Sequence, residues 1–426
     1  MIIVDDSLRR RAADGNPIRV GVIGAGFMGR AMVDQMMRRM VGFDVVAIYN
    51  RTREAAEQAY SAAGVESVVH VEHPDRLDEI VAGGGHATVS DPGVICAANS
   101  IEAVMEITGE IEFGATVATD AIRHGKHLVL VNAELDATVG PILKVMADEA
   151  GVVITNADGD EPGVAMNLLR FVSSVGYKPV LAGNIKGFLD PHRNPDTQAG
   201  FAREHGQQPK MITSFADGTK LSMESAVLAN ATGFGVARRG MTGHRCEHVR
   251  NVVDHIDPEE LLERPRIDYV LGADPGSGAF VVGYDDSPDR SLYMRYFKMG
   301  DGPAYVFHRP YHLVHLEAPL SVARAVLFGD ATITPAAGPV CEVLATAKRD
   351  LAAGETLDGI GGFTCYGVID NVAAVRSENL LPMGLADGCR LVRDVQMDRP
   401  IRLDDIELPE GRLVDDLWRR QHKHFS

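Results

Sequence analysis

The sequence predicts an α/β fold in which an N-terminal doubly wound parallel sheet is followed by an α+β domain and a small β-rich domain. Three observations carry this prediction. Short apolar runs alternate with helical stretches through the first third of the chain, which is typical of strand–helix–strand units. A glycine-rich turn joins the first apolar run to the first helical stretch. Beyond about residue 157 the pattern changes to helices, then alternating strands, then short turn-rich runs.

The parallel sheet is expected to contain six strands. Strands are predicted where short apolar runs are bounded by polar or turn-forming residues, and helices where apolar residues recur at helical spacing. Six such strands with intervening helices fit a doubly wound fold of the kind that binds dinucleotides. The expected strands are Ile18–Ile23, Asp44–Tyr49, Gly93–Cys96, Ala103–Ile107, Leu128–Val131 and Val152–Thr155, with helices at Phe27–Arg39, Thr52–Ala63 and Pro141–Ala150.

Two further domains are expected, so that the boundaries run 1–157, 158–335 and 336–426. The last domain is expected to be β-rich because its runs are separated by glycine turns. The helix Leu313–Phe328 is expected to pack back onto the first domain. The other elements expected in the middle domain are the helices Pro162–Ser174 and Glu224–Phe234 and the strand-like runs Tyr269–Leu271, Gly278–Val282, Ser291–Met299 and Tyr305–His308.

The strongest motif is the run Gly24-Ala25-Gly26-Phe27-Met28-Gly29, which lies between a strand and a helix. Gly24 permits a tight turn, Gly26 lets the backbone approach a pyrophosphate, and Gly29 lets the helix pack closely on the strand. The helix N-terminus adds amide donors and positive potential. The motif therefore predicts a Rossmann domain that binds a dinucleotide, with Phe27 and Met28 also at the cofactor.

The second strand indicates which dinucleotide is bound. An enzyme that uses NAD usually has Asp or Glu at the end of this strand to hold the ribose 2′-hydroxyl. This chain has Asn50 and Arg51 instead. Because an arginine can pair with a 2′-phosphate, the sequence favours NADP(H) over NAD(H), with Asn50 and Arg51 as binding residues. The alternative is that Arg51 is a solvated residue ahead of the next helix.

Charge and cysteine content restrict the partners. A formal net charge of −17 argues against nucleic acid or an anionic membrane as the main partner, since both require a positive surface. Five scattered cysteines without a C-x-x-C pair indicate a reducing compartment, and no apolar run is long enough to span a membrane. We therefore expect a cytoplasmic protein. The charge does not exclude a small phosphorylated substrate, because a pocket needs only two or three basic side chains. We also expect it to form a homo-oligomer.

Three further segments carry a family resemblance. VMEITG at Val104–Gly109, KHLVLVNAELDA at Lys126–Ala137 and VVITNADGDEPGV at Val152–Val164 resemble the homoserine dehydrogenase-like oxidoreductases. DLAAGETLD at Asp350–Asp358 resembles the signature of a SAF-type domain. Together they resemble the branch that includes the deoxyxylulose phosphate reductoisomerase-like enzymes. The resemblance implies an NAD(P)-dependent oxidoreductase of isoprenoid precursor synthesis.

The chain differs from these enzymes at one pair of neighbouring residues. Homoserine dehydrogenases and ordinary reductoisomerases carry Asn-Lys after the strand that matches Leu128–Val131. This chain has Asn132-Ala133, so the lysine is missing and simple homoserine dehydrogenase activity is disfavoured. Asn132 is expected to face the nicotinamide.

Carboxylates and lysines in the middle domain predict metal-assisted chemistry. Asp158 and Asp160 follow the last strand of the parallel sheet, where substrate meets this fold, and Lys220 and Glu224 lie in a second segment. Hard oxygen ligands from two loops suit Mg²⁺ or Mn²⁺, which would polarise a substrate's carbonyl and hydroxyl oxygens. The resemblance implies the same: Asp158-x-Asp160 and Lys220…Glu224 resemble the metal turn and later helix of ordinary reductoisomerases. Helix capping by the aspartates and a surface ion pair between Lys220 and Glu224 are the alternatives.

Other residues complete the predicted site. Lys186 is expected on a loop between glycines, as a proton donor or phosphate anchor that acts with Lys220, Asp160 and Glu224 in catalysis. Asn156, Arg309 and His312 are expected to contact substrate, although His312 and its neighbours suit a hinge or pocket lining as well. The leading hypothesis is an NADPH-dependent reductoisomerase for a phosphorylated ketose.

Two alternatives stay open. One is a metal-free NAD(P) dehydrogenase for a homoserine-like, sugar-acid or polyol substrate. The other, of a different class, is a dinucleotide-responsive binding protein.

Overall fold

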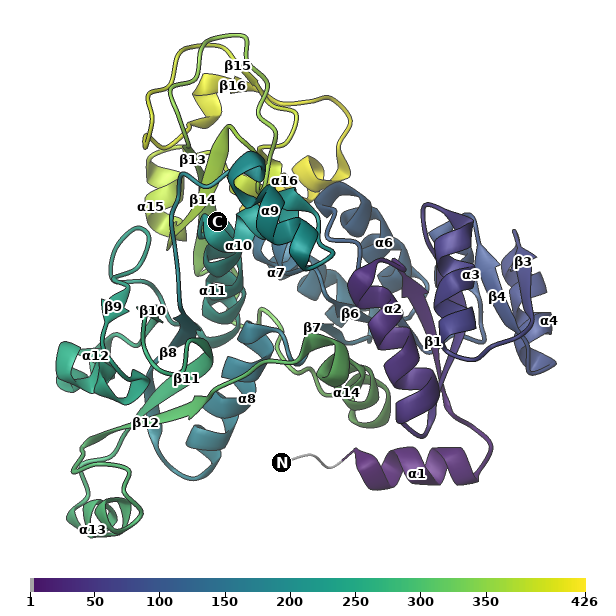
Figure 1. Ribbon diagram of the computed structural model, residues 1–426, viewed down its shortest axis with the longest axis horizontal. Helices are drawn as coiled ribbons and strands as arrows, with labels where there is room; N and C mark the ends of the chain where they lie inside the picture. The colour runs from purple at the N-terminus through teal and green to yellow at the C-terminus, as the bar shows by residue number, and fades with distance from the viewer. Residues whose placement is uncertain (1–3) are drawn as a thin grey trace. The chain divides into compact units, whose positions relative to one another are not determined.

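The computed structural model describes residues 4–426, and its chain divides into two compact units (Figure 1). The first unit comprises the chain up to Asp136, then Ile142–Asp160 and Leu313–Thr334. The second comprises Ala137–Pro141, Glu161–His312 and Pro335–Ser426. In the described residues, no helix is long and apolar enough to cross a membrane.

The first unit is built on a seven-stranded, fully parallel sheet with the order β3-β4-β2-β1-β5-β6-β7. The strand order changes direction at β1, which pairs with β2 on one side and β5 on the other. This is the doubly wound arrangement that the sequence predicts. The strands are β1 (Ile18–Ile23), β2 (Phe43–Tyr49), β3 (Val68–Val71), β4 (His86–Val89), β5 (Ala103–Glu106), β6 (His127–Leu130) and β7 (Ile154–Asn156).

One predicted strand of this sheet is wrong. Gly93–Cys96 lies in the helix α5 (Pro92–Ala97), which begins with a proline in its first turn. The Asp91 carboxylate accepts a hydrogen bond of 2.8 Å from Gly93 N and so caps the helix. Short buried apolar runs have the same pattern in strands and in helices, and here the Asp91 cap favours the helix. The two strands that the prediction missed, β3 and β4, are four residues each.

Helices cover the parallel sheet and share its core. The predicted helix α14 (Val314–Phe328) places Ala318 and Val322 in the same buried cluster as Val20 and Met32, which confirms that it packs on the first unit. The other helices of this unit are α1 (Asp5–Ala13), α2 (Phe27–Asp34) with the π-helical turn η1 (Gln35–Arg39), α3 (Arg53–Ala62), α4 (Pro74–Ala82), α6 (Ile111–Arg123) and most of α7 (Ala133–Ala150).

The second unit contains a mixed five-stranded sheet with the order β12-β11-β8-β10-β9. Strand β11 is antiparallel to β8 and β12, whereas β10 is parallel to β8 and β9. Helix α8 (Glu161–Ser174) packs on β8 and β11. The strands are β8 (Lys178–Lys186), β9 (His244–Arg245), β10 (Arg266–Leu271), β11 (Ser277–Tyr284) and β12 (Ala304–Arg309), and the other helices before β13 are α9 (Pro195–Glu204), α10 (Pro209–Ala216), α11 (Thr219–Thr232), η2 (Val249–His255), α12 (Pro258–Glu263) and α13 (Pro288–Tyr296).

A second predicted strand is wrong. Most of Ser291–Met299 lies in or just after α13, a helix that begins with Pro288 and buries none of its residues. Its aromatic residues favour a strand by intrinsic preference, but the proline in the first turn suits a helix start. Because no side chain of this helix is buried, apolar periodicity could not identify it.

The last ninety residues belong to the second unit, where the sequence predicted a separate domain. They contact α11 and the turn that precedes it through buried polar groups. The Lys348 ammonium donates to Asp217 at 2.9 Å, and the Asn230 side chain accepts hydrogen bonds from the backbone of Val340 and Cys341. Its helices and strands are mostly short and include two small antiparallel sheets, in agreement with the predicted β-rich character. Its likeness to a SAF-type domain stays a prediction. Its elements are β13 (Cys341–Ala347), β14 (Cys365–Asn371), α15 (Val372–Ser377), η3 (Met383–Leu385), β15 (Arg390–Leu391), η4 (Leu403–Asp405), β16 (Ile406–Glu407) and α16 (Leu413–His424).

Candidate active site

The glycine loop of the first unit joins β1 to α2. Gly24 has a positive φ of 109°, which favours glycine, and a Cβ added to Gly29 would lie 2.0 Å from the Gly24 carbonyl oxygen. A Cβ added to Gly26 would meet no atom within 4 Å, so that position faces open space. Gly24 and Gly29 are therefore required by the turn itself, whereas Gly26 leaves room for a ligand.

The residues after β2 support this loop. The Asn50 side chain accepts a hydrogen bond of 2.9 Å from Ala25 N, so it braces the loop. The Arg51 side chain is exposed and forms no hydrogen bond or ion pair within residues 4–426. Its guanidinium is therefore available for a 2′-phosphate. Phe27 and Met28 are 54% and 37% exposed at the start of α2.

Two predicted asparagines are buried and already committed to the fold. Asn132 caps α7 by accepting from Leu135 N at 3.0 Å, and its amide donates to the Glu106 carboxylate at 2.9 Å. Asn156 donates to Asp136 and accepts from Ala157 N. Both side chains therefore have structural roles. That Asn132 contacts the nicotinamide and Asn156 contacts the substrate stay predictions.

Two buried carboxyl groups lie near these asparagines. Burial raises the pKa of Glu106, against hydrogen bonds from Thr108 and Asn132 that lower it. Burial also raises the pKa of Asp136 to about 7, with Asn156 as its hydrogen-bond partner. Asp136 therefore titrates near neutral pH.

The second unit holds a buried cluster of charged side chains. Glu161 begins α8, Glu224 lies on α11, and Lys186 is the last residue of β8. The Lys186 ammonium donates to the Glu161 carboxylate and lies 3.5 Å from Oε2 of Glu224. The Glu161 and Glu224 side chains are 5% and 1% exposed. The Lys186 ammonium thus contacts two carboxyl groups that are shielded from solvent.

The carboxyl groups of Glu161 and Glu224 share a hydrogen bond. Burial would raise the pKa of Glu161, but the Lys186 ammonium, a hydrogen bond with Glu224 and the nearby His312 together lower it to about 2. A hydrogen bond between two carboxyl groups needs one proton. The pair therefore holds one proton between its two carboxyl groups. A carboxyl pair that holds a single proton is an arrangement from which acid and base roles arise.

Three more side chains border the pair. Asn184, two residues before Lys186 on β8, donates to Oε2 of Glu224 at 2.9 Å. Lys220 lies one helical turn before Glu224, with its Nζ atom 4.0 Å from Oε1, and is only 11% exposed. The His312 Nε2 atom is 3.8 Å from Oε1 of Glu161. The predicted residues Lys186, Lys220, Glu224 and His312 therefore come together, and the Lys220 pair is not a surface pair.

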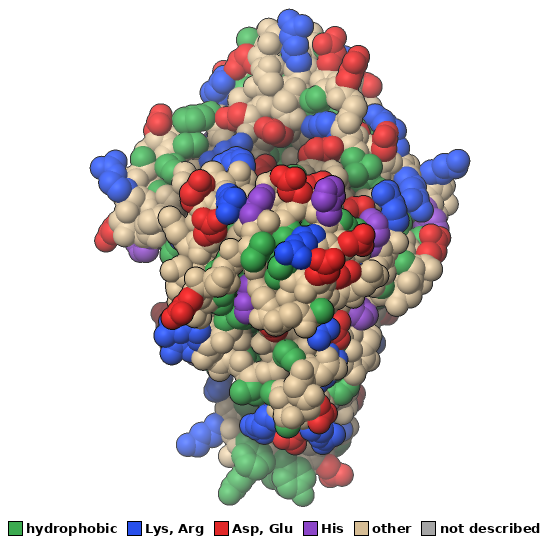
Figure 2. Space-filling view, turned by 90° about the vertical axis from the view of Figure 1, so that its right-hand side faces the viewer, with side chains coloured by type: hydrophobic (Ala, Val, Ile, Leu, Met, Phe, Trp, Pro, Cys, Tyr) green, Lys and Arg blue, Asp and Glu red, His purple; other side chains and the backbone are tan. Residues whose placement is uncertain are grey.

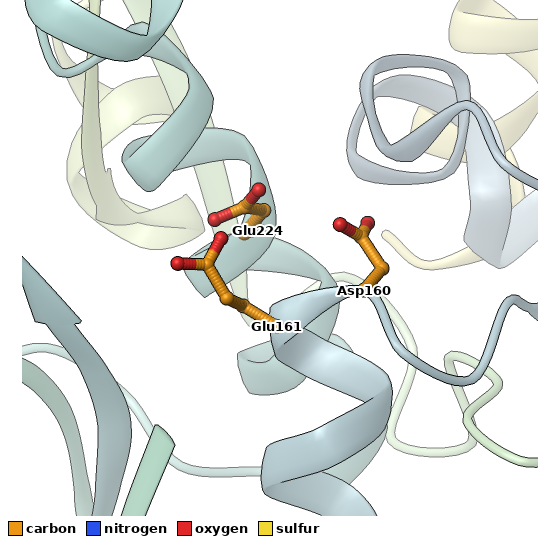
Figure 3. A group of neighbouring side chains, drawn as sticks. All are labelled: Asp160, Glu161 and Glu224. Carbon is orange, nitrogen blue, oxygen red and sulfur yellow. The ribbon is translucent and has the colours of Figure 1, made fainter. Parts of the chain in front are cut away.

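The carboxylates also form a candidate metal centre. Asp160, Glu161 and Glu224 each offer one carboxylate oxygen, and these atoms all lie within 4.8 Å of one another (Figure 3). Three hard oxygen donors suit Mg²⁺ or Mn²⁺. Of the predicted ligands, Asp160 and Glu224 belong to this group and Asp158 does not. The Asp158 carboxylate accepts a hydrogen bond of 2.8 Å from Gly159 N, and Glu161 occupies the third position instead.

Three features of the site differ from the prediction or were missed. Lys186 ends a strand and does not lie on a loop. Asn184 and Lys186 are the polar residues of an otherwise apolar strand end and are spaced by two, a signal that places both on one face. Glu161 is not among the predicted site residues, and a glutamate in the first turn of a helix carries no signal beyond a favourable helix start.

Arg309 lies outside the carboxylate group. Its guanidinium lies over the Tyr311 ring, 4.4 Å from the ring centre. Substrate binding by Arg309 stays a prediction. On the face shown in Figure 2, basic and acidic side chains are interspersed.

Comparisons with known proteins match both units to oxidoreductases. A family model described as the NAD-binding Rossmann fold of an oxidoreductase family matches residues 18–131, and one described as the catalytic domain of oxidoreductase DRL matches residues 159–318. No curated protein matches the chain.

Several solved structures are similar to parts of the chain. An NAD-binding oxidoreductase from Klebsiella pneumoniae is 19% identical over 40% of this chain and 43% of its own, with a TM-score of 0.28. Scyllo-inositol dehydrogenase from Lactobacillus casei with NAD(H) and scyllo-inositol is 12% identical over 63% of this chain and 74% of its own, with a TM-score of 0.37. The 1-deoxy-D-xylulose 5-phosphate reductoisomerase of Zymomonas mobilis with NADPH is 20% identical over 50% of this chain and 58% of its own, with a TM-score of 0.34.

The two family models agree with the geometry. The glycine loop lies within the segment that matches the NAD-binding model, and Glu161, Lys186 and Glu224 lie within the segment that matches the catalytic model. The protein is therefore an NAD(P)-dependent oxidoreductase, and its nicotinamide cofactor binds the Rossmann fold of the first unit.

Proposed function

We propose that the protein is an NADPH-dependent reductoisomerase for a small phosphorylated ketose. The reaction we favour converts 1-deoxy-D-xylulose 5-phosphate to 2-C-methyl-D-erythritol 4-phosphate, a step of isoprenoid precursor synthesis. The observation that carries this proposal is the buried cluster of Glu161, Lys186 and Glu224. It lies in the segment that matches the catalytic domain of oxidoreductase DRL.

Such a reaction makes two demands on the protein. An α-ketol rearrangement moves a carbon substituent between neighbouring carbons while a hydroxyl becomes a carbonyl and the former carbonyl becomes an alkoxide. Reduction of the resulting aldehyde then consumes one hydride and one proton. The site must therefore hold two oxygens of the substrate, accept a proton from one and return protons to the products.

The cluster supplies groups for these proton transfers. Glu161 is held ionised and hydrogen-bonds with Glu224, so the two carboxyl groups can hold one proton between them for transfer. The Lys186 ammonium stabilises negative charge that develops on a substrate oxygen and keeps Glu161 ionised. Lys220 adds a second positive charge near Glu224 and could bind the phosphate. Burial strengthens each of these interactions because little water competes.

A divalent cation fits the same residues. Asp160, Glu161 and Glu224 would hold it, and when bound it would neutralise charge on the two substrate oxygens. Its binding requires the proton held between Glu161 and Glu224 to leave and Lys186 to give up part of its contact with the carboxylates. Metal binding should therefore strengthen as the pH rises.

NADPH is the cofactor we propose. The free Arg51 guanidinium follows β2, at the position where a carboxylate would hold the ribose of NAD. Asn50 braces the glycine loop and does not compete for the 2′-phosphate. These two observations support a preference for NADPH over NADH.

A metal-free dehydrogenase for a homoserine-like, sugar-acid or polyol substrate is the second candidate. One observation favours it: Lys186 already neutralises Glu161 and contacts Glu224, so the carboxylates need no cation to be stable in the fold. A simple dehydrogenase needs one proton-transfer group beside a hydride donor, and this cluster could provide it.

Turnover measurements separate the two candidates. NADPH oxidation should be followed with 1-deoxy-D-xylulose 5-phosphate, with scyllo-inosose and with aspartate semialdehyde, each with Mn²⁺ and with a chelator. The proposal predicts turnover of the phosphorylated ketose, dependent on Mn²⁺ or Mg²⁺. Metal-independent turnover of either other carbonyl compound, with none of the ketose, would make the dehydrogenase the better answer.

A further inference from the structure

A cavity lies in the C-terminal part of the second unit and shares no residue with the carboxylate cluster. Its volume is about 260 Å³. Its polar lining residues are Glu342 on β13, Arg376 on α15, Trp418 and His422 on α16, and Asn379 and Ser426. Val375 and Leu380 are among its apolar lining residues. None of these residues has a role in the function proposed above.

The polar lining of this cavity is incompletely hydrogen-bonded. Within residues 4–426, Oε2 of Glu342, Nε and Nη2 of Arg376, and Nε2 of His422 are buried atoms without a hydrogen-bond partner. The Glu342 residue is only 4% exposed. Buried polar atoms are nearly always paired, and leaving one unpaired is costly. These four atoms belong to three side chains that line one cavity and are out of reach of water here, so a bound group completes them once those side chains move slightly.

The other atoms of these side chains are held in place. Oε1 of Glu342 accepts a hydrogen bond of 2.7 Å from the Trp418 indole, and Nη1 of Arg376 donates to the Phe425 carbonyl at 3.2 Å. The Trp418 and His422 rings lie 4.0 Å apart and form one wall. The unpartnered edge of Arg376, Nε with Nη2, is the edge that binds a carboxylate through two parallel hydrogen bonds.

The charges around the cavity restrict the ligand. Burial raises the pKa of Glu342 to about 7, although Trp418 and Arg376 lower it. Burial and the nearby Arg376 lower the pKa of His422 to about 4, so His422 is neutral at pH 7. Among the charged or titratable side chains of the lining, Arg376 is then the one that carries a permanent charge. A single negative charge balances it, whereas a dianion would also meet the Glu342 carboxyl.

We propose that this cavity binds a small monocarboxylate that carries a hydroxyl or amino group on the neighbouring carbon. Its carboxylate pairs with Nε and Nη2 of Arg376, and its hydroxyl or amino group hydrogen-bonds with Glu342 and His422. The volume of about 260 Å³ lies just below the usual range of small-molecule pockets, about 300–1,000 Å³, which suits a ligand of this size.

The cavity contains its own spectroscopic reporter. Trp418 is the single tryptophan of the chain, so intrinsic fluorescence reports on this site alone. We would titrate the full-length protein with glycolate, L-lactate, glycine and L-serine, and with acetate and inorganic phosphate as comparison ligands. A saturable change is expected with at least one hydroxy or amino acid, at lower concentration than with acetate or phosphate.

Three variants test the assignment. Arg376→Gln should weaken binding at least about tenfold, because it removes a charged two-bond contact. Glu342→Gln keeps an acceptor for Trp418 and should weaken the hydroxy or amino acid while leaving acetate unchanged. Arg390→Gln changes an exposed arginine of the same region and should leave binding unchanged.

Defined outcomes would overturn the proposal. They are no saturable response to any of the four acids in the millimolar range, tighter binding of phosphate, or equal binding by wild type and Glu342→Gln. If Arg376→Gln fails to fold through loss of its contact with Phe425, the Glu342→Gln comparison still decides. Thermal unfolding of each variant provides the folding control.

Discussion

Lys186, the last residue of β8, and Glu161, the first residue of α8, form an ion pair that is largely removed from solvent. Their side chains are 19% and 5% exposed. The pair joins the mixed sheet of the second unit to the helix that packs on it. It also keeps the pKa of Glu161 at about 2 despite burial. Stability and chemistry are therefore coupled at this contact.

Replacement of Lys186 should affect both properties. Lys186→Met leaves Glu161 buried without its counter-ion, which should cost about 3–5 kcal/mol of unfolding free energy at pH 7. A lowered folded-state pKa contributes stability above the ordinary pKa of 4.5 that is lost as the pH falls toward 2. The difference from wild type in urea unfolding should thus shrink between pH 7 and pH 3.5. Lys178→Met, at the exposed start of β8, is the matched control and should change stability by less than about 1 kcal/mol.

Metal binding should depend on Asp160 and Glu224 but not on Asp158. Asp160→Asn and Glu224→Gln each remove one of the three grouped carboxylates, and Mn²⁺ affinity measured by calorimetry should fall at least about tenfold. Activity should fall about a hundredfold, near 2.7 kcal/mol. Asp158→Asn should bind Mn²⁺ as wild type does. Wild-type affinity should rise with pH, because the proton held between Glu161 and Glu224 leaves on binding. Equal affinity in all four proteins would exclude this centre.

Arg51 should discriminate between the two dinucleotides. Arg51→Ala should weaken NADPH by about 1–3 kcal/mol and leave NADH nearly unchanged, since the lost contact is with the 2′-phosphate. Arg53→Ala provides the control, because Arg53 already pairs with Glu57 at 2.7 Å. Fluorescence titration with both cofactors measures the effect. An equal loss for NADPH and NADH would remove Arg51 from the 2′-phosphate.

The glycines of the loop should separate folding from cofactor binding. Gly29→Ala places a methyl group against the Gly24 carbonyl and should lower the melting temperature of the free protein. Gly26→Ala meets no protein atom and should melt as wild type does, yet lose dinucleotide binding. Calorimetric melting with and without NADPH distinguishes these effects. Full cofactor binding by Gly26→Ala would place the pyrophosphate elsewhere.

Asp136 should make stability fall as the pH rises. Its folded-state pKa of about 7 exceeds its ordinary value of 3.8, so the folded state binds more protons between these values, and stability declines across that window. Asp136→Asn removes the ionisation and should be more stable than wild type at pH 8, by an amount on the order of 4 kcal/mol at most. At pH 4 the two proteins should be similar. A pH-independent difference between the two proteins would contradict this assignment.

Local chemistry made much of the first unit predictable from the sequence. Gly24 and Gly29 are required by a turn conformation and a backbone contact within six residues, so the motif identifies them without tertiary information. Strand β1 matches its predicted bounds because its apolar run is bounded on both sides. The predicted strand Gly93–Cys96 failed because a capped helix and a buried strand can share one short apolar pattern.

The dinucleotide fold and the residue types of the candidate site could be predicted from the sequence alone, because turns, caps and periodicity act over a few residues. The sequence also identified Lys186, Glu224 and Asp160 as candidates. That Glu161 and not Asp158 completes the carboxylate group follows only from the packed structure. Acidic residues three positions apart look alike in sequence, and which one faces a lysine more than twenty residues away depends on how α8 packs against β8. Burial, which sets the pKa of Glu161, likewise exists only once those elements have packed.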